Sequence, residues 1–172
     1  MQMNEGMDTG DILLRRAVTI QPTDTSMHLW ERLSQVGAEL LVETLDNYEK
    51  ITPQVQNHEN ASYAPILKKS DGLLDWQQSA VQLCNRIRGL QPWPGAWTWF
   101  RGETLKIWSA QPCSGTGVPG QVLQTKKGPI IATGSGAIRI LECQLPGKKR
   151  GPAINLVNGT RLQTGEQFGQ EP

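Results

Sequence analysis

Cysteine and histidine are scarce in this chain, and both scarcities narrow what it can do. Its 172 residues include three widely spaced cysteines, Cys84, Cys113 and Cys143, and two histidines, His28 and His58. No two cysteines form a Cys-x-x-Cys pair, and a zinc site needs a denser ligand set, so we expect no metal. An odd number of dispersed cysteines is typical of free thiols in a reducing compartment, so we expect a cytoplasmic protein.

Long apolar runs and a strong charge of either sign are missing too. No stretch approaches the roughly 18 residues of a membrane span, so we expect no membrane contact. The first residues, 1–5, have neither the basic nor the apolar region of a signal peptide. Seventeen Lys and Arg against 16 Asp and Glu leave a net charge of +1. This excludes a uniformly basic polyanion binder, so any nucleic-acid contact must come from local patches.

A loop rich in glycine and aspartate, residues 5–11, provides the sharpest catalytic candidate. It reads Glu-Gly-Met-Asp-Thr-Gly-Asp and leads into the apolar run Ile12–Leu14. Enzymes of the α/β class place catalytic groups in loops at the ends of strands. Asp8 can orient a histidine or accept a proton from an attacking amine. Alternatively, it is a turn aspartate that bonds its own backbone. Asp11 fits a turn or the start of a strand.

Two elements are predicted in the first part of the chain. Alternating apolar residues over 12–20 predict a strand, and apolar residues at helical spacing over 25–47 predict a helix with one apolar stripe. One strand and one helix cannot bury that stripe. We therefore expect residues 1–47 to be poorly ordered, sticky or dimerising in isolation. Residues 48–62 are polar and predict an extended linker.

The second part of the chain predicts a short helix followed by β-structure. The helix spans about 77–90 and ends before two prolines. Glycine-rich turns separate five short strands, which favours a small OB-like barrel. A short helix near 153–157 and a disordered polar tail over 163–172 follow. The predicted strands are 97–100, 104–108, 121–125, 129–133 and 137–145.

Basic residues cluster in several places, and each cluster has two interpretations. Lys148, Lys149 and Arg150 lie between glycines, where they suit contact with phosphates, or form a solvated basic turn. The pairs 68–69 and 126–127 are similar but weaker. Arg86 and Arg88 could face a phosphate backbone, and their role is left open. The tryptophans fit a protein core better than platforms for stacked bases.

Several motifs occur together in a fixed order. They are Gly-Met-Asp-Thr-Gly-Asp-Ile-Leu at 6–13, Tyr-Ala-Pro-Ile-Leu-Lys at 63–68, Asp-Trp at 75–76, Ile-Arg-Gly-Leu-Gln-Pro-Trp-Pro-Gly-Ala-Trp at 87–97 and Pro-Gly-Lys-Lys at 146–149. In this order and spacing, they resemble the C-terminal half of the methionyl-tRNA formyltransferase family. The resemblance runs from residue 1 to about residue 162.

The resemblance implies a fold and a division into parts. The fold class is α+β: the C-terminal end of a Rossmann-like formyltransferase domain followed by a small OB-like β-barrel. Residues 1–47 would be the partial formyltransferase domain, 48–62 a linker, 63–162 the tRNA-binding domain and 163–172 a disordered tail. The complete family protein is expected to be a monomer.

The resemblance also implies a reaction and its residues. The family transfers a formyl group from 10-formyltetrahydrofolate to the amino group of methionyl initiator tRNA, in translation initiation. Asp8 matches the aspartate of a catalytic Asn, His and Asp set, in which the Asn would stabilise the oxyanion. The basic face that grips the tRNA would include Lys68, Lys69, Arg86, Arg88, Lys148, Lys149 and Arg150.

The sequence departs from the family in what it lacks. The Asn, the His and the folate-binding loop should precede Asp8, and His28 and His58 do not match the family's His. We therefore expect the chain to be inactive alone, as a remnant, a split gene or a product of an internal start. Two alternatives stay open: a non-catalytic tRNA- or RNA-binding OB module, and a fragment of a sister formyltransferase acting on sugar amines.

Overall fold

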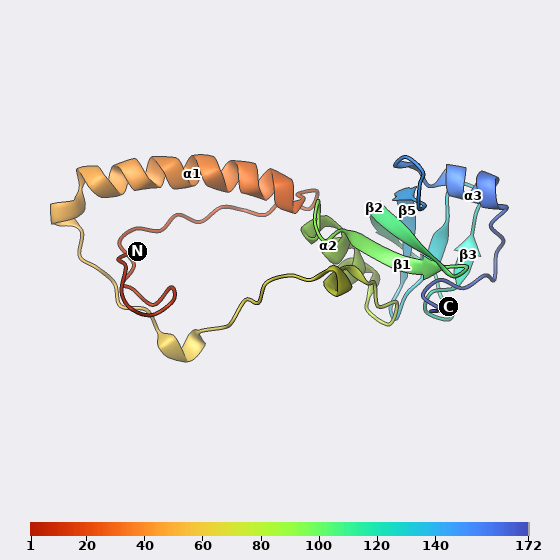
Figure 1. The fold of residues 1–172 in the computed structure, drawn as a ribbon, viewed down its shortest axis with the longest axis horizontal. Coiled ribbons are helices and arrows are strands. Elements are labelled where there is room, and N and C mark those ends of the chain that lie inside the picture. Colours follow the sequence, from red (N-terminus) through yellow and green to blue (C-terminus); the bar gives the residue numbers. More distant parts are fainter. Residues whose placement is uncertain (172) are drawn as a thin grey trace. The chain divides into compact units, whose positions relative to one another are not determined.

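The computed structural model describes residues 1–171, and the contacts within it divide the chain into two units, Met1–Ile66 and Leu67–Pro172. Across the described residues, the secondary structure is an α+β mixture of three α-helices and one antiparallel sheet (Figure 1). None of the helices in this range is both long and apolar enough to cross a membrane. The polar segment 48–62 belongs to unit 1.

Unit 1 is dominated by the helix α1, Ser26–Asp46, which confirms the helix predicted over 25–47. The hydroxyl of Thr25 accepts a hydrogen bond from the backbone N–H of His28 (3.4 Å), and Nδ1 of His28 accepts one from the N–H of Thr25 (3.4 Å). This reciprocal cap satisfies donors that the first helical turn leaves unpaired. None of the side chains of α1 is buried, and Trp30 is 74% exposed.

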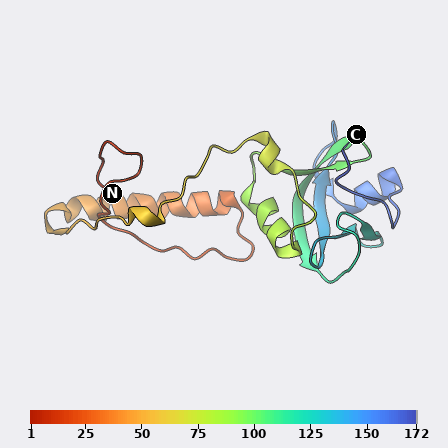
Figure 2. The ribbon, with the colours of Figure 1, turned by 90° about the horizontal axis from the view of Figure 1, so that it is seen from below.

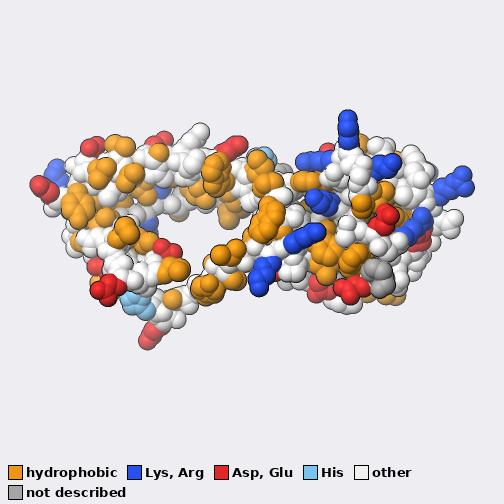
Figure 3. Space-filling model, in the orientation of Figure 1, with side chains coloured by type: hydrophobic (Ala, Val, Ile, Leu, Met, Phe, Trp, Pro, Cys, Tyr) orange, Lys and Arg blue, Asp and Glu red, His pale blue; other side chains and the backbone are white. Residues whose placement is uncertain are grey.

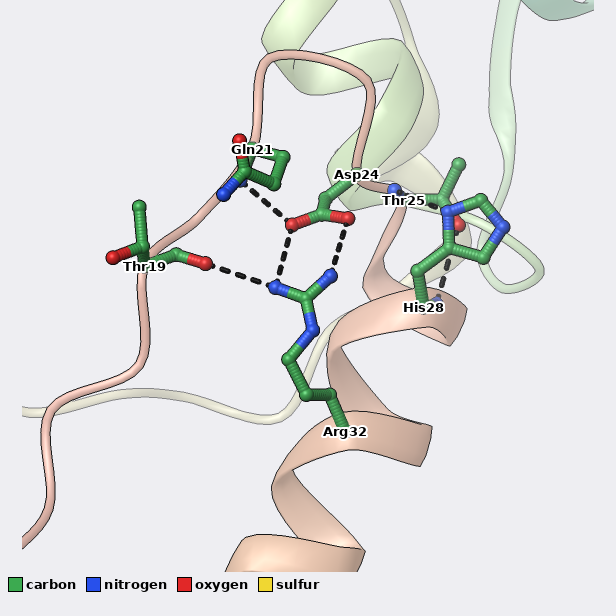
Figure 4. Close-up of polar contacts among 6 residues, drawn as sticks. All are labelled: Thr19, Gln21, Asp24, Thr25, His28 and Arg32. Carbon is green, nitrogen blue, oxygen red and sulfur yellow. Dashed lines mark hydrogen bonds and ion pairs between the residues drawn. The ribbon is translucent and has the colours of Figure 1, made fainter.

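A buried carboxylate fixes the chain entering α1. Asp24 accepts hydrogen bonds from Arg32 (2.8 and 3.1 Å) and from the backbone N–H of Gln21 (2.7 Å). Arg32 also donates to the carbonyl oxygen of Thr19 (2.9 Å). Figure 4 shows the guanidinium of Arg32 lying between the chain segment that leads into the helix and the first turns of the helix. One arginine thus ties the helix to the segment that precedes it.

Acidification is expected to loosen this start of α1. The guanidinium of Arg32 and then the backbone N–H of Gln21 hold the pKa of Asp24 below its usual range. A carboxyl with a lowered pKa stabilises the folded state above its unfolded pKa of about 3.9, and this stabilisation is lost as the pH falls through the folded pKa. Far-UV circular dichroism should therefore show helix loss below about pH 4 that is smaller in Asp24→Asn. Equal loss in both proteins would contradict this origin.

The strand predicted over 12–20 is wrong. Only Ile12 pairs, in an isolated bridge with Gln54 whose two N–O distances are both 2.9 Å. A strand needs a neighbouring strand for its hydrogen bonds, and no described residue offers one to 13–20. This extended segment instead lies alongside α1 (Figures 1 and 2). Arg16 of the segment forms ion pairs with Glu39 (3.1 Å) and Glu43 (2.5 Å) of the helix.

Unit 2 is built on a six-stranded antiparallel sheet. The hydrogen-bonded order is β1-β2-β5-β4-β3, and β6 pairs with β5, so the path is open at β1 and β3. The first two predicted strands, 97–100 and 104–108, are confirmed and form a hairpin, with Arg101 and Gly102 both at positive φ as its two-residue turn requires. The strands are β1 Ala96–Phe100, β2 Glu103–Cys113, β3 Val122–Gln124, β4 Ile130–Ala132, β5 Ala137–Gln144 and β6 Gly151–Pro152.

Two helices accompany this sheet. The helix α2, Ala80–Gly89, starts at a reciprocal cap between Ser79 and Gln82 and packs on β2 and β5. Its buried side chains include Leu83 and Ile87, which are fully enclosed. The helix α3, Ile154–Thr160, follows β6. Both helices confirm short helices predicted from the sequence, and the long strands β2 and β5 form the centre of the core between them.

The tail predicted to be disordered over 163–172 is wrong for the residues that the structure describes. Phe168 is 2% exposed and stacks on Phe100, with ring centroids 4.9 Å apart. The guanidinium of Arg101 binds both carboxylate oxygens of Glu166 (2.8 and 2.9 Å), which lowers the pKa of that carboxyl. Although residues 163–171 are mostly polar, the ring of Phe168 and the ion pair of Glu166 with Arg101 hold the segment against the sheet.

Candidate functional site

The loop that carries Asp8 is held in place through its backbone. The side-chain amide of Gln56 donates to the carbonyl oxygens of Asp8 (2.9 Å) and Gly10 (2.6 Å), and the backbone N–H of Gln2 donates to the carbonyl oxygen of Asp11 (2.8 Å). A Cβ at Gly10 would lie 1.8 Å from the carbonyl oxygen of Gln2, so only glycine fits there. The loop is therefore closed on itself and pinned to the segment around residue 56.

Asp8 itself has a positive φ of 54° and an exposed side chain. It lines an open hollow of about 1080 Å³ in unit 1, together with Arg15 and His58. Among residues 1–171, no hydrogen bond or ion pair joins the Asp8 carboxylate to a histidine or an asparagine. His28 serves in the cap of α1, whereas His58 begins the short 3-10 helix His58–Asn60.

The position of His58 in the wall of this hollow has no signal in the sequence. It follows from the bridge between Ile12 and Gln54 and from the hydrogen bonds of Gln56, which bring the segment 54–58 to the Asp8 loop. From the sequence, this histidine belongs to an extended linker. Its place beside the loop is a tertiary effect of a single antiparallel bridge.

Lys68 and Lys69 lie at the start of unit 2, where both are exposed. The N–H of Lys68 donates to the carboxylate of Asp71 (2.6 Å), which caps the 3-10 helix Lys69–Gly72. The carbonyl oxygen of Lys69 accepts a hydrogen bond from the indole of Trp97 (3.0 Å). The backbone of Lys69 is thus tied to β1 and that of Lys68 to the 3-10 helix, while both side chains are exposed.

Arg86 and Arg88 already have partners within unit 2. Arg86 donates to the carbonyl oxygen of Asp71, and its Nε is buried without a hydrogen-bond partner in the described part of the chain. Arg88, in the last turn of α2, donates to the side chain of Asn85 (2.7 Å). Both arginines are half-buried. Arg86 therefore joins α2 to the start of the unit, a role that the sequence left open.

The basic loop, residues 146–151, is anchored near its C-terminal end by Arg150. Its guanidinium Nε lies 3.0 Å from a carboxylate oxygen of Glu142 on β5. The same guanidinium lies over the ring of Trp108 on β2, 5.0 Å from the centroid. Ion pairing and cation–π contact both fix the side chain. The charge of Arg150 is therefore shared with Glu142.

The N-terminal part of the basic loop is held by Gln144, the last residue of β5. Its amide donates to the carbonyl oxygen of Lys148 (2.8 Å), and its oxygen accepts from the indole of Trp108 (3.0 Å). Lys148 and Lys149 are exposed, and neither side chain has an ion-pair partner among the residues that the structure describes. The loop therefore presents two unpaired cations on a backbone fixed at both ends.

Charge is divided unequally between the two units. Unit 1 has 4 Lys and Arg against 10 Asp and Glu, a formal charge of −6, whereas unit 2 has 13 against 6, a formal charge of +7. All seven predicted tRNA-binding residues belong to unit 2, and Asp8 belongs to unit 1. Figure 3 shows many Lys and Arg side chains on the displayed face of unit 2. The net charge of the whole chain conceals this basic unit.

The cysteines do not add chemistry to either region. Cys84, Cys113 and Cys143 are free thiols, and burial raises the pKa of Cys84 and of Cys143 to about 11. Such thiols stay protonated at neutral pH and are poor nucleophiles. Within residues 1–171, no group of three or more His, Cys, Asp or Glu side chains is placed to hold a metal ion.

Two family descriptions match the chain. "Formyl transferase" matches residues 1–45, and "Formyl transferase, C-terminal domain" matches residues 66–161. A methionyl-tRNA formyltransferase of Solibacter usitatus is 46% identical over 99% of this chain and 56% of its own length. One from Geobacter sulfurreducens is 43% identical over 99% and 55%. The chain thus spans about half the length of the curated relatives it matches.

Solved structures share the fold at low identity. A variant of HypX from Aquifex aeolicus has a TM-score of 0.65 at 19% identity, over 96% of this chain and 30% of that one. HypX in complex with tetrahydrofolic acid has a TM-score of 0.64 at 18% identity, over 98% and 32%. WlaRD, a sugar 3N-formyl transferase, has a TM-score of 0.63 at 17% identity, over 86% and 53%.

Proposed function

The chain belongs to the formyl transferase family, and on that premise we propose that it forms the C-terminal part of a methionyl-tRNA formyltransferase. The observation that carries the proposal is the 46% identity to such an enzyme over 99% of the chain. The first family match, residues 1–45, contains the Asp8 loop, and the second, residues 66–161, contains the basic loop. The activity is proposed for a polypeptide that supplies both parts of the enzyme.

The proposed reaction transfers the formyl group of 10-formyltetrahydrofolate to the amino group of methionine on initiator tRNA. The amine nitrogen attacks the formyl carbon and loses a proton, and tetrahydrofolate leaves as its nitrogen takes up a proton. The Asp8 carboxylate would hold the histidine that assists the removal of the amine proton, while an asparagine would stabilise the oxyanion. The solved neighbour bound to tetrahydrofolic acid supports a folate co-substrate.

The exposed cations of unit 2 fit the tRNA-binding role. Lys148 and Lys149 lie on an anchored loop, and Lys68 and Lys69 add exposed cations at the start of the same unit. Arg88 and Arg150 would share their charge with protein partners, and Arg86 would act mainly within the fold. The proposal further assigns the open sheet of unit 2 to an OB-like fold, the protein to the cytoplasm and the complete enzyme to a monomeric state.

A non-catalytic RNA-binding module is the second candidate. It is favoured by the formal charge of +7 on unit 2, which suffices for RNA binding whether or not the formyltransferase site is complete. In that case Asp8 would have no catalytic role. A sister enzyme acting on sugar amines is less favoured, because the methionyl-tRNA formyltransferases are 43–46% identical to this chain, whereas the sugar 3N-formyl transferase WlaRD is 17% identical.

Replacing Lys148 and Lys149 by alanine should weaken binding of initiator tRNA about tenfold at moderate salt. Each lysine that contacts a phosphate releases counterions. The plot of log affinity against log salt concentration should therefore become shallower in the double variant, its negative slope decreasing in magnitude by about 1.5. Fluorescence anisotropy with labelled initiator tRNA over a range of salt concentrations measures both quantities.

The matched control is the lysine pair Lys126 and Lys127, which is exposed on another turn of unit 2. Replacing this pair by alanine removes the same charge from the unit. A much smaller loss of affinity would assign the contact to the basic loop. Equal losses from both double variants would instead indicate general attraction to a basic unit and would contradict a defined site on this loop.

A further inference from the structure

A small hollow lies beside the basic loop in unit 2. Its volume is about 380 Å³, and it is bounded by β5, β6 and α3 as well as by the loop itself. Leu145, Pro152 and Leu156 contribute apolar walls, whereas Lys148 and Lys149 contribute to its rim. An apolar recess is thus bordered by the two exposed lysines that have no ion-pair partner among the described residues.

The chemistry of this hollow matches one nucleotide. Its volume is at the lower end of the roughly 300–1000 Å³ of ligand sites, which suits a single ring system. A nucleobase is flat and largely apolar on its faces, and its edge carries hydrogen-bonding groups that the side-chain amide of Asn155 could meet. The phosphates on either side of such a base would lie toward the rim, where the two ammonium groups complement their charge.

We propose that this hollow receives one unstacked base of the bound RNA, with Lys148 and Lys149 on the flanking phosphates. The inference rests on the proposed tRNA-binding function and adds to it a defined subsite for a single-stranded nucleotide. Proteins commonly recognise RNA through bases that are splayed out of loops and ends. The site would therefore select unpaired segments of a tRNA over its helical stems.

Gly159 offers a way to close the hollow without changing charge. It lies on the wall formed by α3, has no positive φ, and an added Cβ would meet no atom within 4 Å. Leucine at this helical position is compatible with the backbone and would occupy part of the space for the base. Alanine at the same position adds a Cβ and leaves most of the hollow open.

The test compares RNA with and without bases, using the full 172-residue chain. The probes are a labelled single-stranded oligoadenylate and the same strand with abasic residues, measured by fluorescence anisotropy. We expect the unchanged chain and Gly159→Ala to bind the intact strand about five- to tenfold more tightly than the abasic one. In Gly159→Leu this preference should disappear, while binding of the abasic strand stays unchanged.

Further variants distinguish a failure of the base-binding hollow from a failure of the proposed tRNA binding. The Lys148→Ala, Lys149→Ala variant should weaken binding of both strands, because it removes phosphate contacts. Gly89→Leu places the same side chain at an open position of α2, away from this hollow, and should keep the preference for the intact strand. A preserved preference in Gly159→Leu, or none in the unchanged chain, would overturn the subsite while tRNA binding stands. No binding of tRNA or of either strand would overturn both proposals.

Discussion

Phe168→Ala is expected to lower the free energy of unfolding of unit 2 by about 3–5 kcal/mol. Phe168 is 2% exposed, and its ring contacts those of Phe100 and Trp76, with centroid distances of 4.9 and 6.0 Å. Its N–H donates to the carbonyl oxygen of Gly120 (2.8 Å). Truncation would leave a cavity between two aromatic rings and free the segment that follows Glu166. Urea unfolding followed by tryptophan fluorescence measures the loss.

Val81→Ala is the matched control, because it removes apolar atoms from a side chain of the same unit that is 58% exposed. Its effect should stay within about 0.5 kcal/mol. Limited proteolysis adds a second measurement, since a released tail becomes accessible to cleavage after Arg161. A loss below about 1 kcal/mol in Phe168→Ala, with no new cleavage, would restore the expectation of a disordered tail.

Asp8→Ala is expected to lower the rate of formyl transfer by about a thousandfold in a complete enzyme. Such an enzyme can be assembled by joining the N-terminal part of the Solibacter usitatus relative to this chain. The loss would be large because catalytic residues that act as a unit lose most of their effect when one is removed. Formylation of methionyl initiator tRNA with 10-formyltetrahydrofolate measures it.

Asp11→Ala is the control for that experiment, because it changes a carboxylate in the same loop whose backbone contact with Gln2 is retained. We expect it to keep the rate within a few-fold. The 172-residue chain without the joined part should show no turnover. An Asp8→Ala fusion that works as well as the unchanged fusion would remove Asp8 from the catalytic set and favour the RNA-binding module.

Elements with a strong local signal could be predicted from the sequence. The helix α1 follows from apolar residues at helical spacing, and the strands of the first hairpin, 97–100 and 104–108, follow from short runs between glycine-rich turns. The basic loop is also local, because its lysines and flanking glycines are consecutive. Its anchorage is not local, since Glu142 and Trp108 reach Arg150 only through the pairing of β2, β5 and β6.

The errors share a physical cause, which is dependence on partners distant in the chain. Residues 12–20 have the alternation of a strand, but a strand forms only beside another strand, and within this segment the described structure gives a backbone bridge to Ile12 alone. Residues 163–171 have the composition of a tail, yet Phe168 finds its site between Phe100 and Trp76, more than sixty residues away. Composition reports none of these long-range contacts.

The opposite charges of the two units have a consequence for handling the protein. An isoelectric point near 7.7 describes a molecule with almost no charge at neutral pH, which ordinarily passes through an ion-exchange column. Formal charges of −6 and +7 on separate units make it a polyampholyte instead. An anionic resin meets the basic unit 2, and a cationic resin meets the acidic unit 1. Retention of the protein on either resin therefore follows the charge of one unit rather than the net charge of the whole chain.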